Sequence, residues 1–192
     1  MKKLDNYGTE MIPIRLIISI SIITAITAMI VVSYQNISII MSENKIQNEI
    51  DEIESKLYTM IKSGVARDID IYNSENGTMR TKKIDLPSNI IYLSFGVDPD
   101  PDNNGELTTG LTTNGSAIFY KVEGGNKNVI WLDSEEIRFR EGNFSNNRWI
   151  INKKGQGLIL TSGGINSITF ELIEKNYEKY ILIHSNDNLE KM

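Results

Sequence analysis

The chain has 192 residues, with 20 Lys and Arg against 25 Asp and Glu, and it contains no cysteine. This length suits one compact domain of roughly 100–150 residues plus an anchor. A net charge of -5 gives no basic field to attract phosphate backbones, so nucleic acid is not an expected partner. Without cysteine there is no disulfide, thiolate metal site or cysteine nucleophile, and the domain depends on its core for stability.

The first predicted element is an uncharged apolar run from Leu16 to Val32. As a helix it spans roughly 26 Å, close to the hydrocarbon thickness of a bilayer, and Tyr34 follows as an interfacial residue. We predict a cytoplasmic flank at residues 1–15 and a transmembrane helix at 16–34; a buried helix of a soluble protein is the alternative. Four hydroxyls in the run are expected to bond to the carbonyl one turn earlier: Ser19, Ser21, Thr24 and Thr27.

The flanking charges predict the orientation of this helix. Lys2, Lys3 and Arg15 precede the run, whereas only Lys45 follows it within about twenty residues. We therefore expect the N-terminus in the cytoplasm and the rest of the chain outside. A cleaved secretory signal is the alternative, although the apolar run is longer than the roughly 7–15 residues usual for a signal peptide.

Residues 35–64 predict an amphipathic stalk helix that ends at Gly64. Apolar residues recur there at alternating three- and four-residue steps among charged and amide residues. The stripe packs either against the chain's own β domain or, as a helix seam, against copies of the chain or a partner, because its spacing matches coiled-coil a and d positions. The candidate seam residues are Ile46, Ile50, Ile53, Leu57 and Met60.

Residues 65–192 predict an extracytoplasmic β domain. Short β-branched or aromatic runs alternate there with Gly, Asn and Asp clusters, and no helical segment separates them, so parallel pairing is not expected. The fold class is α+β, a long N-terminal helix followed by an antiparallel sheet or sandwich built from hairpins. Nine runs are predicted as strands: 67–72, 79–86, 89–97, 116–123, 128–133, 136–140, 148–152, 157–162 with the following 165–174, and 179–185. Turns are predicted at 87–89, 124–126, 142–143, 163–164 and 175–176.

An acidic segment carries the one candidate metal site. Asp98, Asp100 and Asp102 at alternate positions, followed by Asn104 and Gly105, supply hard oxygen donors at a spacing typical of calcium loops. Two prolines stiffen the segment, and no helices flank it. The alternative is a solvated acidic loop between strands, which the same residue types form without a metal.

No constellation in the sequence points to catalysis. His184 is the single histidine and is interpreted as structural. Glu171 and Glu174 are interpreted as solvent-facing strand residues, and Trp131 and Trp149 as packing residues. We therefore expect a protein that is not an enzyme.

The N-terminal sequence MKKLDNYG followed by TEMIPIRLIISISIITAI resembles the archaeal type IV pilin-like proteins. In that family a class III leader is cut before the apolar helix; here Gly8 precedes the cut and Thr9 becomes the new N-terminus. The familiar pattern has a glutamate fifth after the cut, whereas here Glu10 is second, Pro13 is fifth, and Arg15 lies within the helix.

The resemblance implies a membrane-anchored structural or accessory subunit of a type IV pilus-like assembly, with a β-rich head outside the cell. Its partners are then the lipid bilayer and copies of itself or other pilin-like subunits. The alternative is a membrane-tethered β domain that binds a surface sugar, a cell-envelope layer or a protein partner. No cofactor is expected other than calcium at the acidic loop.

Overall fold

The computed structural model describes residues 7–71, 74–108, 110, 115–132, 137–145, 148–152 and 156–185, and only the backbone of residues 7–12. The chain divides into two compact units, Met1–Met41 and Ser42–Met192, and each is described by itself. This division differs from the predicted boundary at residue 64, because the second half of the helix belongs to the β-rich unit.

One helix, α1 (Tyr7–Ser63), contains both the predicted span and the predicted stalk. It stops where the sequence predicted, at Gly64, whose N–H donates to the Met60 carbonyl oxygen at 2.8 Å. A Cβ at Gly64 would overlap that same oxygen and lie 2.9 Å from Thr78 Oγ1. Glycine is therefore the residue that fits where the chain leaves the helix and enters the sheets.

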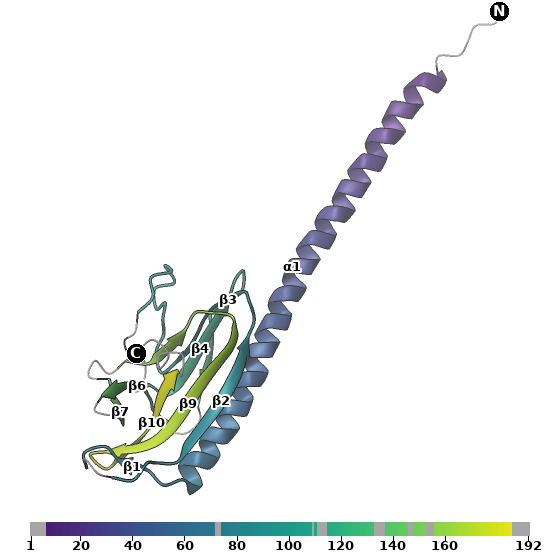
Figure 1. Cartoon of the computed structure of the whole chain (residues 1–192). Coiled ribbons are helices and arrows are strands. Elements are labelled where there is room, and N and C mark those ends of the chain that lie inside the picture. The colour runs from purple at the N-terminus through teal and green to yellow at the C-terminus, as the bar shows by residue number, and fades with distance from the viewer. Residues whose placement is uncertain are drawn as a thin grey trace, which may run out of the picture. The chain divides into compact units, whose positions relative to one another are not determined.

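In the described part of the chain ten strands follow α1, and the cores of all except β6 lie within the predicted runs (Figure 1). Most of β6 lies beyond the predicted run 136–140. The predicted turn at 142–143 is wrong, because one strand continues through it to Ser145. Among the described residues of the first run, 67–71, two lie in a strand. The strands are β1 (Arg67–Asp68), β2 (Met79–Leu86), β3 (Ile90–Phe95), β4 (Ala117–Val122), β5 (Asn128–Trp131), β6 (Phe139–Ser145), β7 (Arg148–Ile151), β8 (Leu158–Leu160), β9 (Gly164–Lys175) and β10 (Glu178–Ser185).

The strands form two sheets, one of which is mixed. The first sheet has the order β1-β9-β10-β6-β7, with β2 also paired to β9, and the second has the order β5-β4-β3-β8. The expectation of antiparallel pairing alone is wrong for two pairs, since β1 is parallel to β9 and β6 is parallel to β10. Between β6 and β10 the chain passes through β8 in the other sheet, so strands make the crossover that usually requires a helix.

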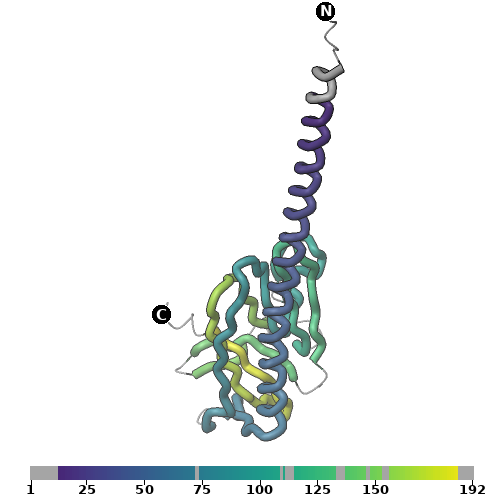
Figure 2. The backbone as a smooth tube through the Cα atoms, turned by 90° about the vertical axis from the view of Figure 1, so that its right-hand side faces the viewer, coloured from purple at the N-terminus to yellow at the C-terminus, as the bar shows by residue number. Residues whose placement is uncertain are grey.

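The second half of α1 is part of the core of the β-rich unit. The five candidate seam residues Ile46, Ile50, Ile53, Leu57 and Met60 are at most 1% exposed. Figures 1 and 2 show this part of the helix running along β2 and across the sheets. The prediction that these residues form a helix seam with another chain is therefore wrong, because their side chains are already buried by their own domain. The alternative, that the stripe packs against the chain's own β domain, is the arrangement in the structure.

Polar contacts attach this half of α1 to both sheets. Lys82 on β2 places its ammonium between two helix carboxylates, 2.8 Å from Glu49 and also against Glu52. On the second sheet, the Tyr120 hydroxyl donates to Gln47 at 3.4 Å. The helix thus contributes one apolar face and one charged edge to the same unit.

The two sheets meet through aromatic side chains. Phe95 of β3 makes edge-to-face contacts with Phe139 and Phe170, at centroid distances of 5.5 and 5.9 Å. Side chains on β9 alternate between two faces as predicted, yet both faces are buried, with Phe170 on one and Thr169 on the other. The β6–β7 hairpin covers the second face through Trp149, which stacks on His184 of β10.

Candidate functional site

The first half of α1 is apolar on all sides and uncovered within its own unit. From residue 13 to residue 38 every side chain is exposed, including Ile17 at 62% and Ile23 at 63%. Among the described residues one helix is long and apolar enough to cross a membrane, and its 18-residue window of mean hydropathy 2.5 contains no buried residue. An apolar surface of this extent requires a non-aqueous environment or another protein surface.

Four hydroxyl groups of the apolar run 16–32 are satisfied by the helix itself, which confirms the predicted back-bonding. Each donates to the carbonyl oxygen four residues earlier at 2.8–2.9 Å. These bonds remove the cost of placing a hydroxyl in hydrocarbon. The four donors are Ser19, Ser21, Thr24 and Thr27.

The predicted cleavage point lies at the beginning of the same helix. Because α1 begins at Tyr7, the bond between Gly8 and Thr9 falls in its first turn. The side chains of these residues lie outside the described part of the structure, and leader cleavage stays a prediction.

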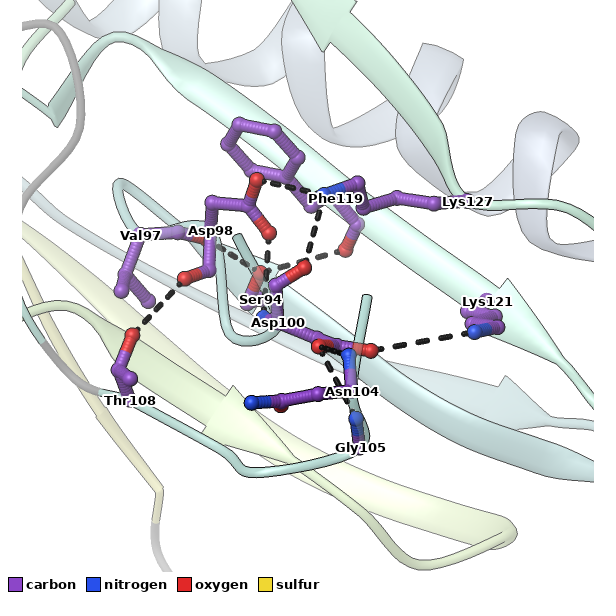
Figure 3. Close-up of polar contacts among 10 residues, drawn as sticks. All are labelled: Ser94, Val97, Asp98, Asp100, Asn104, Gly105, Thr108, Phe119, Lys121 and Lys127. Atoms are coloured by element: carbon purple, nitrogen blue, oxygen red, sulfur yellow. Dashed lines mark hydrogen bonds and ion pairs between the residues drawn. The ribbon is translucent and has the colours of Figure 1, made fainter. Parts of the chain in front are cut away.

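The acidic segment 98–105 folds back over the second sheet (Figure 3). Ser94 of β3 donates its hydroxyl to the Val97 carbonyl at 2.7 Å, which fixes the start of the loop. The Thr108 N–H donates to the Pro99 carbonyl at 2.6 Å and closes its other end. Because Val97 is fully buried, the loop forms a cover over the sheet.

Within the loop, Asp98 and Asp100 act as acceptors for the backbone. Asp98 Oδ1 accepts the Asp100 N–H at 3.1 Å, and Asp100 Oδ1 accepts the N–H groups of Asn104 and Gly105 at 2.8 and 3.1 Å. Asp102 is exposed on the outside of the turn. The structure therefore brings together two of the three predicted aspartates.

Two lysines face these carboxylates. Lys127 Nζ lies 2.8 Å from Asp98 Oδ2 and 2.8 Å from the Asp100 carbonyl oxygen, and Lys121 Nζ lies 3.9 Å from Asp100 Oδ2 (Figure 3). Among the described residues no group of three or more His, Cys, Asp or Glu is arranged to hold a metal. Calcium binding at this loop stays a prediction.

Tyr92 lies beneath this loop. In the β3–β4 register it is paired with Lys121, so both side chains point to the face that the loop covers. Burial, followed by the charges of Asp98 and Asp100, raises the pKa of the Tyr92 hydroxyl to about 12. That hydroxyl has no hydrogen-bond partner among the described residues.

A second buried polar cluster lies on the far face of the first sheet. Arg67 of β1 and Glu171 of β9 form an ion pair at 2.5 Å with side chains 3% exposed, and Arg67 Nη2 donates to the Trp149 carbonyl at 2.8 Å. The interpretation of Glu171 as solvent-facing is wrong, because β1 and the β6–β7 hairpin cover it. Sequence reasoning missed this pair, since its members are 104 residues apart.

His184 is stacked flat on Trp149, with ring centroids 3.7 Å apart. Its two ring nitrogens lack partners among the described residues. Burial lowers the pKa of His184 to about 4, against a smaller opposing effect of the Glu171 charge. The histidine is therefore neutral at pH 7 and serves as a packing surface, in agreement with its interpretation as structural.

Comparisons of the chain with protein-family models, curated proteins and solved structures find no match. The most informative feature of the chain is the contrast between the exposed apolar half of α1 and the buried half.

Proposed function

We propose that this protein is a membrane-anchored, pilin-like surface protein, a structural or accessory subunit of a type IV pilus-like assembly without enzymatic activity. The first half of α1 lies in the bilayer or among neighbouring apolar helices. The β-rich unit is displayed outside the cytoplasm, with the N-terminal flank inside.

The observation that carries this proposal is the exposed apolar surface of residues 13–41. Seventeen uncharged residues at 16–32 match the hydrocarbon thickness at roughly 26 Å. The hydroxyl groups within them are internally bonded, so the segment brings no unsatisfied side chain into lipid.

The orientation follows from the charges that flank the segment. Lys2, Lys3 and Arg15 lie on its N-terminal side, and positive residues are retained on the cytoplasmic side. The resemblance of the leader sequence around Gly8 supports processing by a membrane peptidase at that side.

The proposal is tested by determining the mature N-terminus of the protein, purified from native membranes, by mass spectrometry. We expect a start at Thr9 and recovery of the protein in high-molecular-weight assemblies. Replacing Gly8 by Val is expected to leave the leader attached, whereas the control Tyr7→Phe is expected to be processed normally.

A start at Met1, with a monomer or small oligomer in the membrane, would contradict pilin-like processing. The chain would then be a tethered binding module with an ordinary single-pass anchor. The same extract distinguishes the two results, because the leader changes the mass of the intact protein.

A further inference from the structure

The exposed apolar surface of α1 is longer than a bilayer is thick. Side chains are exposed from residue 13 to residue 41, apart from the half-buried Ile39, and this length of helix spans roughly 44 Å. The hydrocarbon core of a bilayer is about 30 Å thick and covers about 20 residues of a helix. Because Arg15 is charged, it belongs at the cytoplasmic border, and the outer border then falls near residue 35. Part of the apolar surface therefore lies outside the hydrocarbon.

Amide side chains mark this outer border. Gln35 and Asn36 follow the apolar run, and they would lose their hydrogen bonds to water if they entered hydrocarbon. A deeper position of α1 would place both amides in lipid. The residues that follow therefore lie outside it, yet Ile37, Ile40 and Met41 are 55%, 56% and 67% exposed. Exposed apolar side chains gathered in this way mark a contact with another surface.

Apolar residues on both sides of this border share one side of the helix. Four residues follow one another at steps of three, four and three, which is the a and d spacing of a coiled coil, and we call them the border stripe: Ile30, Ser33, Ile37 and Ile40. Gln35 lies on the opposite side. A groove follows the stripe, with the small Ser33 among larger residues, and such a position receives a side chain from a facing helix. The groove is lined by Ile26, Met29, Ile30, Ser33, Tyr34 and Ile37.

The sequence and the anchor favour a second copy of this chain as the partner of the border stripe. Residues 16–42 contain no charged residue, so identical helices do not repel each other there. The anchor holds every copy at the same depth and in the same direction, so the stripe of one copy lies level with the stripe of the next. Confinement to one membrane also raises the effective concentration of the copies.

We propose that two copies of the chain pair in parallel and in register through their border stripes, at the outer border of the membrane. Such a pair has two-fold symmetry, with Ile37 of one copy facing Ile37 of the other. It covers apolar side chains that lipid does not cover and that are exposed in the single chain. This pairing rests on the membrane anchor of the proposed function and does not require leader cleavage.

The test introduces single cysteines into the full chain, which has none, and treats native membranes with the oxidant copper phenanthroline. Ile37→Cys and Ile40→Cys are expected to form a disulfide-linked dimer, because facing a and d positions bring the two Cα atoms within about 7 Å. Gln35→Cys is the matched control at nearly the same depth. With helix axes about 8–10 Å apart, its Cα atoms lie on the outer sides of the pair and are too distant for a disulfide, so no dimer is expected.

Second-site changes assign the dimer to the border stripe. Adding Ile37→Glu to Ile40→Cys places like charges face to face and is expected to abolish the dimer. Adding Gln35→Glu to Ile40→Cys puts the same charge on the opposite side and is expected to leave the dimer unchanged. Both changed side chains are exposed, so the melting temperature of the β-rich unit should stay the same.

Four results would overturn this pairing while leaving the anchor intact: equal dimer formation at positions 35, 37 and 40, no dimer at 37 and 40, a dimer that persists with Ile37→Glu, or a product whose mass is not twice that of the mature chain. Recovery of the protein outside the membrane fraction would overturn the anchor as well.

Discussion

The two halves of α1 have the same backbone conformation and opposite surroundings. Residues 13–41 expose apolar side chains on every side, whereas residues 42–63 bury one stripe and expose charged and amide groups. The apolar side chains of residues 13–41 require an apolar environment from outside their own unit. The apolar stripe of residues 42–63 is instead covered by the β-rich unit to which it belongs. The distribution of apolar residues around the helix, rather than helix propensity, therefore determines where each half can lie.

The largest expected effect is the loss of a buried side chain from the second half of α1. Leu57→Ala should lower the free energy of unfolding by about 2–5 kcal/mol, because it removes apolar contacts and leaves a cavity. Ile23→Ala is the matched change in the exposed half and should leave the unfolding of the domain unchanged. Chemical denaturation in detergent measures both; equal effects would show that the halves do not differ in packing.

Acid should act on the β-rich unit and leave the apolar half of α1 unaffected. The folded-state pKa of His184 is about 4, below its ordinary value of 6.5. As pH falls from about 7 to 4, the unfolded chain binds a proton at His184 that the folded chain does not bind. The free energy of unfolding therefore falls by up to about 3 kcal/mol, and about 2 kcal/mol of this loss occurs between pH 7 and pH 5.

His184→Phe retains a ring to stack on Trp149 and has no titrating group. We expect its free energy of unfolding to change by about 2 kcal/mol less than that of the native protein between pH 7 and pH 5. Parallel pH profiles for the two proteins would disprove this origin of acid sensitivity. Throughout the titration, the protein should stay in the membrane fraction.

A smaller effect should result from loss of the charged edge between α1 and β2. Lys82→Met removes a buried ammonium and leaves Glu49 without its 2.8 Å partner, which should destabilise the domain by about 1 kcal/mol. Lys56→Met is the control, because its contact with Glu52 is exposed and should have no measurable effect. Denaturation midpoints that shift equally would indicate that burial of Lys82 does not matter.

Local patterns in the sequence predict the helix, its end at Gly64 and the cores of all the described strands except β6. Each of these features follows from a local signal, either hydrophobic periodicity or a residue that terminates a helix or forms a turn. Every such signal depends on residues within a few positions of one another in the sequence. The parallel pairing of β6 with β10 was not predictable in this way, because it depends on a crossover through the other sheet. Gly142 also favoured a turn, whereas in the structure β6 continues through it.

The polar contacts of the candidate sites were less predictable than the elements that carry them. The sequence marked Asp98 and Asp100 as cation ligands, but their partner Lys127 lies 29 residues from Asp98 and follows a different strand. Arg67 and Glu171 each look like ordinary strand residues until the fold buries them together. Such pairs depend on tertiary packing, which local periodicity does not specify.

The most direct test of the membrane anchor uses the absence of cysteine from the chain. Single cysteines are introduced as Ile23→Cys in the apolar half of α1 and Ser55→Cys on the exposed face of the other half, and intact cells are treated with a membrane-impermeant maleimide. We predict labelling of Ser55→Cys in intact cells, and labelling of Ile23→Cys only after the protein is denatured in detergent. Labelling of Ile23→Cys in intact cells, or protection of Ser55→Cys until the membrane is opened, would contradict the account.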